Sequence, residues 1–390
     1  MSDQLASALA KLTAVADDPD AYVRDWTRRT AGKAIGAFPM NFPAEIAHAA
    51  GALPVIIQEN REPDTSGRTL LAEFYCGYTR NLADQATKGR FDLYDGIFFA
   101  DHCIQLLGAV DVLRFSAPGT PMYFGQLETS LADAWAPGAI RDKLGKFIEE
   151  IGTFMGTSIT PTALGESIRL FNENRRMLRS LYEARKAGNA RFTSAEMQVL
   201  VKSSMVMDKV EHNELLRQIL AEVAQVPRDD RVRLHLSGHF CHAPKPELLA
   251  AIEECGALVV NDDLYTGGRF ISTDVAEHGD PIEAIGEWYL ARDANFPCPT
   301  RVKHATDWED RLVDEVESSG AQGVIVLMVK FCEPHMFYYP ELRKRMIERD
   351  IPHLLVETEH EGVPLESLRT RVEALLERIR TNELVAGGRK

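Results

Sequence analysis

The sequence predicts an α/β protein that consists of two parallel-sheet domains joined by a helical region. Short apolar runs alternate with helical patterns in the first part of the chain, and the same alternation returns in the last part. Between them, residues 137–226 show helical periodicity and few strand signals. Strands that alternate with helices usually form parallel sheets covered on both faces. We therefore expect two doubly wound, Rossmann-like or flavodoxin-like domains at 1–136 and 228–390, with the helical region at 137–227.

The first domain is expected to begin with a short N-terminal helix, followed by alternating strands and helices. Its apolar runs predict strands at 33–38, 52–57, 94–100 and 121–125. The segments with helical periodicity predict helices at 44–51, 73–89 and 104–115. Gly51 is expected to end the first of these helices, because glycine readily adopts the left-handed conformation that commonly terminates a helix.

The last part of the chain repeats this architecture without repeating its sequence. Apolar runs predict strands at 232–238, 257–262, 323–329 and 353–357, of which "GVIVLMV" at 323–329 is the most apolar. Helical periodicity predicts helices at 246–256, 281–293, 306–320, 334–349 and 364–382. Sequential strands joined by helices again favour a parallel sheet.

The composition argues against some classes of partner. The chain has 58 acidic and 44 basic side chains, a formal net charge of −14. A protein this acidic is a poor ligand for nucleic acid or for an anionic membrane surface. No apolar run reaches about 18 residues, the length of a membrane-spanning helix, and the N-terminal stretch lacks the apolar core of a signal peptide. We expect a cytoplasmic protein whose cysteines are reduced.

Several common catalytic motifs are missing from the sequence. It contains no G-x-x-x-x-G-K-[ST], and no G-x-G-x-x-G follows a predicted strand. A phosphate-binding P-loop and a dinucleotide site therefore have no support. G-x-S-x-G and H-E-x-x-H are also absent, which disfavours the serine hydrolases and zinc proteases that use them. The six cysteines are left as the main chemical signal.

Two cysteines follow the ends of predicted strands. Cys103 comes just after the strand at 94–100, and Cys332 just after the strand at 323–329. Ligands of open α/β sheets bind beyond the carboxyl ends of the strands, so both thiols could face one cleft, with Cys76 joining them from the start of a helix. Three thiolates could hold an iron–sulfur cluster with one open iron site. They could equally be buried thiols, because free cysteine is among the most buried residue types.

The remaining cysteines carry weaker signals. The segment "HLSGHFCH" offers imidazole and thiol groups that suit zinc: His235, His239, Cys241 and His242. However, one of these histidines lies within a predicted strand, and two of the four residues are adjacent, which makes a poor tetrahedral set. We favour a loop that lines a ligand cleft. Cys255 and Cys298 are expected to be structural.

Four segments together resemble one family. They are "GAFPMNFPAEIAHAAGALPVII" (36–57), "EFYCGYTR" (73–80), "FFADHC" (98–103) and "VKFCEPHMFYYPELRK" (329–344). The combination resembles the benzoyl-CoA reductase / 2-hydroxyacyl-CoA dehydratase family. Within it, the resemblance is to the smaller catalytic, or gamma, subunit of the ATP-dependent class I reductases.

The resemblance implies a cofactor and partners. Catalytic subunits of this family hold a 4Fe–4S cluster through three cysteines, which map onto Cys76, Cys103 and Cys332. The chain would pair with a homologous larger catalytic subunit and act on an aromatic acyl-CoA. A separate ATP-hydrolysing activator with a bridging 4Fe–4S cluster would deliver electrons from ferredoxin. The missing P-loop agrees with a nucleotide site on the activator.

The resemblance also implies a reaction. The chain would reduce benzoyl-CoA to a cyclohexadienoyl-CoA by single-electron transfer, and a proton donor would be needed near the ring. His102 and His335 are the candidates. The segment "PMNFP" at 39–43 and the "SGH" after the strand at 232–238 are expected to line the substrate pocket. The aromatic residues near Cys332 are expected to shield the cluster: Phe331, Phe337, Tyr338 and Tyr339.

Two alternatives stay open. The chain could instead resemble the family's dehydratases in function, as a subunit of a 2-hydroxyacyl-CoA dehydratase that eliminates water through a ketyl radical. It could also be a cluster-free subunit that binds an acyl-CoA or acts as a scaffold. The first alternative needs only catalytic amounts of reductant, whereas the reductase consumes it stoichiometrically.

Overall fold

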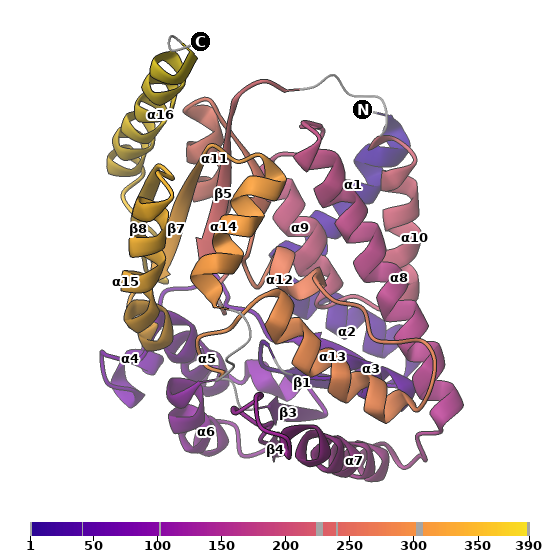
Figure 1. Cartoon of the computed structure of the whole chain (residues 1–390). Helices are drawn as coiled ribbons and strands as arrows, with labels where there is room; N and C mark the ends of the chain where they lie inside the picture. Colours follow the sequence, from indigo (N-terminus) through magenta and orange to yellow (C-terminus); the bar gives the residue numbers. More distant parts are fainter. Residues whose placement is uncertain are drawn as a thin grey trace.

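Two four-stranded parallel sheets form the framework of the protein (Figure 1). The computed structural model describes residues 2–40, 42–100, 103–223, 229–238, 241–301 and 307–387 of the chain. The first sheet has the order β2-β1-β3-β4, and the second has the order β6-β5-β7-β8. The strands are β1 Ala34–Ala37, β2 Leu53–Ile56, β3 Gly96–Ala100, β4 Met122–Gly125, β5 Val232–Gly238, β6 Ala257–Asp262, β7 Gly323–Val329 and β8 His353–Thr358. The predicted fold class is confirmed.

The N-terminal sheet is accompanied by short helices. They are α1 Asp3–Asp17, α2 Pro19–Thr30, α3 Ala44–Ala49, α4 Ser66–Leu70, α5 Gly77–Thr87 and α6 Ile104–Ser116, with the 3₁₀ helix η1 Arg90–Leu93. The single N-terminal helix expected from the sequence is in fact two. Asp18 separates them, because its carboxylate accepts a hydrogen bond from the backbone N–H of Ala21 at 3.0 Å and Pro19 occupies the first turn of α2, both typical of a helix start.

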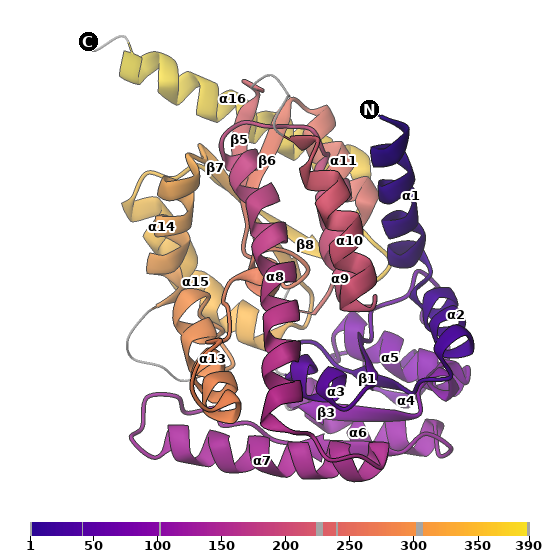
Figure 2. The ribbon, with the colours of Figure 1, turned by 90° about the vertical axis from the view of Figure 1, so that its right-hand side faces the viewer.

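Four long helices connect the two sheets: α7 Ala136–Met155, α8 Pro161–Lys186, α9 Ser194–Ser204 and α10 Lys209–Leu220. Figure 2 shows α8 running from the N-terminal sheet toward the C-terminal sheet, and it packs on both α3 and β6. The charged side chains along α8 are not all exposed to solvent. Arg175 and Arg185 are buried, and each pairs with a buried carboxylate. The division of the chain at 136 and 227 stays a prediction.

The C-terminal sheet is covered on both faces. The helices of this part of the chain are α11 Pro246–Glu254, α12 Gly268–Ile271, α13 Pro281–Asn295, α14 Trp308–Ser319, α15 Glu333–Glu348 and α16 Leu365–Gly387, of which α13 packs on α7 and α8. All seven residues of β7 are buried. Val324 and Val326 of this strand belong to one apolar core, and Ile325 and Leu327 belong to the other. Alternate side chains of a strand face opposite sides of a sheet, so helices must cover both.

The carboxyl end of β5 lies very close to β7. Gly238 has a φ of +112°, and a Cβ at this position would stand 2.3 Å from the carbonyl oxygen of Leu327 and 2.7 Å from the ring of His335. Only glycine tolerates both the left-handed conformation and this approach. The strand therefore ends against the first turn of α15, where the predicted site residues lie.

No helix among the described residues is long and apolar enough to cross a membrane.

Candidate functional site

A pocket between the two sheets brings together the three cysteines predicted to act together. It is lined by Cys76, Cys103 and Cys332, and also by Cys241, His242, Gln105 and His335. Cys103 follows β3 of the first sheet, and Cys332 follows β7 of the second. The carboxyl ends of the two sheets therefore contribute to one site, as expected for parallel α/β folds.

Each of the three cysteines is the N-cap residue of a helix. Cys76 precedes α5, Cys103 precedes α6, and Cys332 precedes α15. The N-terminus of a helix carries a partial positive charge and unpaired backbone N–H groups. Such a position stabilises a thiolate over a thiol. Three helix N-termini around one pocket thus place three partial positive charges near the sulfur atoms, an effect that burial opposes.

A strained residue turns the chain from β7 into α15. Phe331 has a φ of +64°, a left-handed conformation that costs a residue with a side chain about 1 kcal/mol or more. The backbone N–H of Cys332 then donates to the carbonyl of Val329 at 3.0 Å. Pro334 occupies the first turn of the helix, where the missing N–H of proline has no cost. The turn directs the Cys332 side chain to the pocket and Phe331 to the surface.

The aromatic residues of this segment do not all shield the pocket. Phe337 is 82% exposed and Phe331 is 37% exposed, so for these two the prediction is wrong. Tyr338 instead donates a hydrogen bond to Glu309 at 2.6 Å, and Tyr339 packs at the edge of the core. The helical spacing of these residues could not show which face of α15 the fold would bury.

Gln105 ties the cysteine-bearing segments to one another. Its side-chain oxygen accepts a hydrogen bond from the backbone N–H of Cys76 at 2.6 Å. Its side-chain nitrogen donates to the carbonyls of Phe74, at 3.1 Å, and Phe331, at 2.6 Å. Gln105 lies two residues after Cys103, so it links all three segments. The sequence offered no signal for this role except that proximity.

A buried acid–imidazole group adjoins Cys76. Nδ1 of His242 and a carboxylate oxygen of Glu59 share a hydrogen bond of 3.0 Å, and His242 also contacts Cys76. Burial alone would lower the pKa of His242, but the charge of Glu59 and the Cys76 thiol outweigh it and raise the pKa to about 10. Burial likewise opposes ionisation of Cys76, yet His242 holds the pKa of this thiol below its usual value.

Glu59 is held by histidines from two distant segments. His360, which follows β8, also contacts the Glu59 carboxylate through Nδ1. Although burial favours the neutral acid, both imidazoles lower the pKa of Glu59. Gly77 allows this contact, because a Cβ there would stand 2.9 Å from the His360 side chain. Sequence reasoning missed Glu59 and His360, although the position of His360 at a strand's carboxyl end could have drawn attention to it.

The other thiols in the pocket differ from Cys76. Burial raises the pKa of Cys332 and of Cys241, and the neighbouring thiols raise both further. These two thiols therefore keep their protons in the protein alone. A coordinated metal would remove them, because a thiol bound to a metal ion is deprotonated.

The predicted proton donors occupy different situations. His335 lines the pocket, is completely buried and packs on Trp308 with ring centroids 5.1 Å apart. Burial lowers the pKa of His335 to about 4, so the imidazole is neutral at neutral pH. His102 lies outside the described residues, as does His239. The catalytic roles of His102 and His335 stay predictions.

The described donor side chains do not converge on one point as the ligands of a single metal ion would. Among the described residues, no group of three or more His, Cys, Asp and Glu side chains could hold a metal ion. His235 is buried within β5 and is not among the residues that line the pocket. Thiols that bind a multinuclear cluster reach different iron atoms, so they stand around it instead of meeting at one point. Three cysteines on three helix N-termini suit such a cluster.

The remaining two cysteines are not pocket residues. Cys255 lies with its sulfur 3.9 Å from the carbonyl of Arg369, at the contact of α11 with α16. Cys298 is buried, and its thiol lies 3.0 Å from the hydroxyl of Thr300. Neither thiol is among the described residues that line the pocket.

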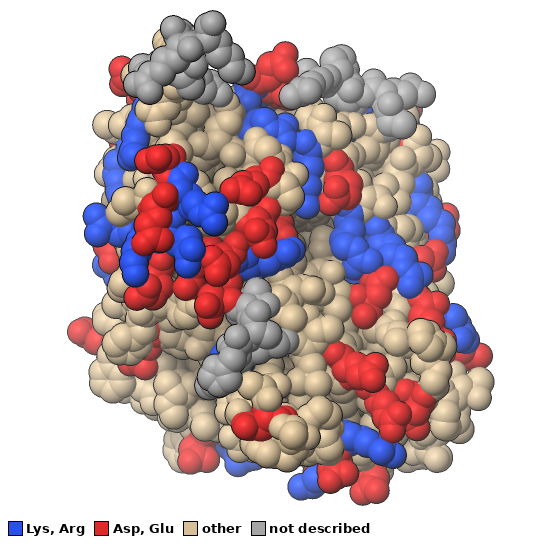
Figure 3. All heavy atoms as spheres, viewed as in Figure 1, with Lys and Arg blue, Asp and Glu red and all other residues tan. Residues whose placement is uncertain are grey.

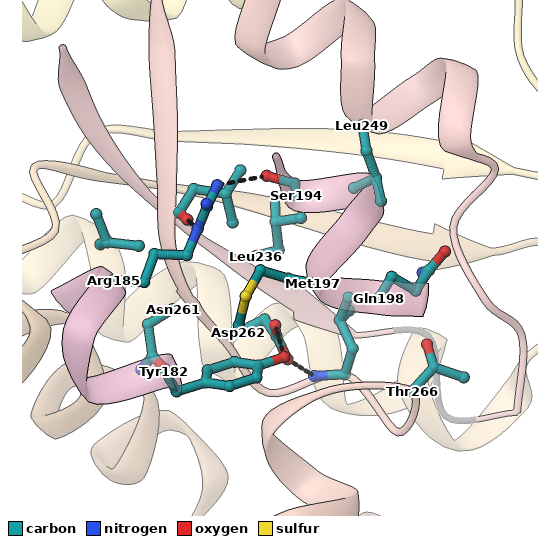
Figure 4. Close-up of a pocket in the computed structure, with 13 residues that line it drawn as sticks. Tyr182, Arg185, Ser194, Met197, Gln198, Leu236, Leu249, Asn261, Asp262 and Thr266 are labelled. Carbon is teal, nitrogen blue, oxygen red and sulfur yellow. Dashed lines mark hydrogen bonds between the residues drawn. The ribbon is translucent and has the colours of Figure 1, made fainter. Parts of the chain in front are cut away.

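A separate cavity, between helices α8 and α9 and the C-terminal sheet, is lined by side chains that make polar contacts with one another (Figure 4). The hydroxyl of Tyr182 donates to Asp262 at 2.7 Å, and Arg185 donates to Ser194 at 3.0 Å. Burial raises the pKa of Asp262 to about 6. These contacts join α8 to β6 and α9, so we assign them a structural role.

Comparisons with known proteins identify the family of the chain. The sequence profile of the family described as "2-hydroxyglutaryl-CoA dehydratase, D-component" matches residues 39–379. This range contains all the cysteines of the pocket.

Characterised relatives cover almost the whole chain. A benzoyl-CoA reductase subunit of Thauera aromatica is 26% identical over 358 residues, which cover 90% of this chain and 92% of that protein. The (R)-phenyllactyl-CoA dehydratase beta subunit of Clostridium sporogenes is 24% identical over 365 residues, 93% of this chain and 96% of that protein. The beta subunit of (R)-2-hydroxyglutaryl-CoA dehydratase from Acidaminococcus fermentans is 24% identical over 360 residues, 88% of this chain and 92% of that protein. The chain belongs to the benzoyl-CoA reductase / 2-hydroxyacyl-CoA dehydratase family.

Proposed function

We propose that the chain is a catalytic subunit of an ATP-dependent, ferredoxin-linked benzoyl-CoA reductase that converts benzoyl-CoA to a cyclohexadienoyl-CoA. The observation that carries the proposal is the convergence of Cys76, Cys103 and Cys332 at three helix N-termini around one pocket. The relative named as a benzoyl-CoA reductase subunit supports the choice of reaction.

These three cysteines would hold a 4Fe–4S cluster, which when bound supplies single-electron transfer at low potential. The protein's own groups have distinct tasks around them. His242, which Glu59 holds in place, lowers the pKa of Cys76 and so favours its anionic form, and the amide of Gln105 holds the segments in position. Several side chains that line the pocket are buried, among them Cys76, His242 and His335, and the low dielectric around them strengthens the interactions between charged groups.

A proton must reach the reduced ring, and His335 is the described candidate. Its neutral imidazole carries one ring N–H that can be donated. Because burial lowers its pKa to about 4, a proton lost from that N–H would have to be replaced from another group. His102, next to Cys103 in the sequence, is the second candidate.

The second candidate function is that of a 2-hydroxyacyl-CoA dehydratase subunit. The family description and two of the relatives above carry dehydratase names. The same three cysteines would serve this reaction. The two candidates differ in reductant: turnover of a reductase consumes it stoichiometrically, whereas a dehydratase needs only catalytic priming.

We further propose that the chain acts in the cytoplasm with a larger homologous subunit, an ATP-hydrolysing activator and ferredoxin. The relatives named above are subunits by their names. Large apolar side chains near the pocket are exposed: Phe74, Ile104, Phe331, Met336 and Phe337. Figure 3 shows few charges over α4, α5 and α6. Exposed apolar patches of this kind often mark protein interfaces.

The experiment is to purify the protein anaerobically with its partner subunits and to measure iron, acid-labile sulfide and the EPR spectrum after reduction. We expect about four iron atoms per chain, lost in Cys76→Ala, Cys103→Ala and Cys332→Ala and retained in Cys255→Ala. Substrate-dependent consumption of reductant then separates reductase from dehydratase. A native protein without iron would leave a cluster-free acyl-CoA-binding or scaffolding subunit.

A further inference from the structure

A second cavity, formed by α3, α8, α10 and α13, carries an excess of positive charge. The described residues that line it include three cationic side chains, Arg175, Lys209 and Arg292, and one carboxylate, Glu45. The three cations are 7%, 6% and 8% exposed, and Glu45 is 1% exposed. Charged groups this deeply buried are normally paired or bound to a ligand.

Arg175 has a counter-charge within the cavity, whereas Lys209 does not. Arg175 forms an ion pair with Glu45, and its other terminal nitrogen donates to Asn172 at 2.9 Å. Lys209 donates to the carbonyl of Ser204 and lies 5.0 Å from the ring of Phe171. Among the described residues, no carboxylate lies within ion-pair distance of its ammonium group. Lys209 therefore has neutral hydrogen-bond partners and no counter-charge.

Arg292 adds a further cation to the same cavity. Its guanidinium lies 5.1 Å from the ring of Trp288, and one of its nitrogens donates to the carbonyl of Met40. A guanidinium stays protonated in proteins, so its positive charge persists within the cavity. Burial also lowers the pKa of Lys209 to about 7, with Arg175 contributing. An anion at this position would therefore be strongly favoured.

The volume of the cavity limits it to a small ligand. The cavity volume is about 40 Å³, which corresponds to about three water molecules. Phe171 and Trp288 form apolar walls beside the cationic groups. A carboxylate with a short carbon chain matches this combination, because its two oxygens can accept hydrogen bonds from ammonium and guanidinium groups while its carbons contact the rings.

We propose that this cavity is a binding site for a small carboxylate, held by the ammonium of Lys209 and attracted by the further positive charge of Arg292 in the same cavity, with Phe171 and Trp288 as its apolar walls. The carboxylate belongs either to a free acid or to the far end of an acyl chain. The inference is independent of the proposed function, because binding is measured without a cluster and without turnover.

The test compares propionate with propionamide, a neutral molecule of nearly the same shape. Binding to the 390-residue chain is measured by calorimetry and by the shift in Tm. We expect propionate to bind and to raise Tm, and propionamide to bind at least about tenfold more weakly, because the charged acceptor is lost. Detectable and equal binding of the two compounds would overturn the proposal.

Lys209→Met supplies the matched variant. It should lose at least about tenfold in propionate affinity and should melt no lower than the native protein without propionate, because it removes an uncompensated buried charge. Lys202→Met is the control. The Lys202 ammonium lies 3.2 Å from the carbonyl of Ala16, and its pKa is lowered by burial to about 8, but it does not line the cavity. Propionate affinity retained in Lys209→Met, or lost equally in Lys202→Met, would contradict the site.

A further binding experiment distinguishes a free acid from a carboxylate at the end of an acyl chain. The succinyl thioester of pantetheine carries a free carboxylate, and its methyl ester does not. Binding of propionate supports a free acid as the occupant. Binding of the succinyl thioester alone, abolished by Lys209→Met, supports the end of an acyl chain. Equal binding of the thioester and its methyl ester, or no binding by any of the carboxylates, would overturn the proposal.

Discussion

Gln105 donates a hydrogen bond to the carbonyl of Phe331 at 2.6 Å, although the two residues lie 226 positions apart. The same side chain accepts a hydrogen bond from the backbone N–H of Cys76. One amide thus connects the segments that carry Cys76, Cys103 and Cys332. The geometry of the thiol pocket depends on this residue as much as on the strands that end there.

Gln105→Leu should destabilise the protein and lower its iron content. The substitution leaves the N–H of Cys76 and the carbonyl of Phe331 without their partner, at a cost of roughly 2–4 kcal/mol for two buried groups. The free energy of unfolding and the iron per chain are the measurements. Gln218→Leu is the control, because the side chain of Gln218 makes only a solvent-exposed hydrogen bond to Glu214 in its own helix. Native iron content in Gln105→Leu would show that the amide does not position the thiols.

Glu253→Ala should cost about 3–5 kcal/mol of stability, because it leaves the buried guanidinium of Arg185 without its counter-charge. Arg185 is 4% exposed in this pair, whereas the control pair of Lys186 and Glu183 lies at the surface. Glu183→Ala should change stability by less than about 1 kcal/mol. Urea denaturation of the two variants provides the comparison. Similar effects of both substitutions would contradict a buried, structural role for the pair.

Lys209 should make stability depend on pH in the alkaline range. Burial and Arg175 lower its pKa to about 7 in the folded protein, against about 10.4 in an unfolded chain. Between these values the unfolded state binds more protons, so stability rises with pH. Relative to Lys209→Met, the native protein should gain about 4 kcal/mol from pH 7 to pH 10.

The measurement is chemical denaturation of both proteins at a series of pH values. The difference between them isolates Lys209 from the other groups that titrate in this range. Below about pH 7 the difference in stability between the two proteins should level off, because Lys209 is then protonated in both the folded and the unfolded state. A constant difference from about pH 6 to pH 10 would mean that the Lys209 ammonium is not desolvated.

Gly238→Ala should be strongly destabilising. The new Cβ would lie 2.3 Å from the carbonyl of Leu327, in a left-handed backbone conformation. We expect a loss of about 3 kcal/mol or more, combining steric overlap with backbone strain. Gly138→Ala, in helix α7 with open space around it, should instead gain up to about 1 kcal/mol. Thermal unfolding of the two variants tests the contrast, and equal melting temperatures would contradict it.

The sequence predicted the fold through periodicity. The apolar run at 323–329 became β7 with the same limits, and the run at 257–262 became β6. Such runs are local signals, because a strand covered on both faces is mostly apolar along its whole length. The N-terminal helices were less clear, since their division at Asp18 depends on a single capping side chain.

The thiol pocket could be predicted in part. The positions of Cys103 and Cys332 after strands placed them at the carboxyl edges of two sheets, where parallel folds bind ligands. The acidic and imidazole side chains next to Cys76 could not be identified from strand-end positions in this way. Glu59, His242 and His360 come from three distant segments and meet only at the contact between the two sheets.

The sequence by itself determined the fold class, the strands and the strand-end positions of the principal cysteines, because each depends on residues close together along the chain. The tertiary structure alone decided that the two sheets share one pocket, that Phe337 faces solvent, and that Lys209 and Arg292 lie in one cavity. These relationships depend on how helices and sheets pack, and packing is set by the combined fit of many side chains instead of any local pattern.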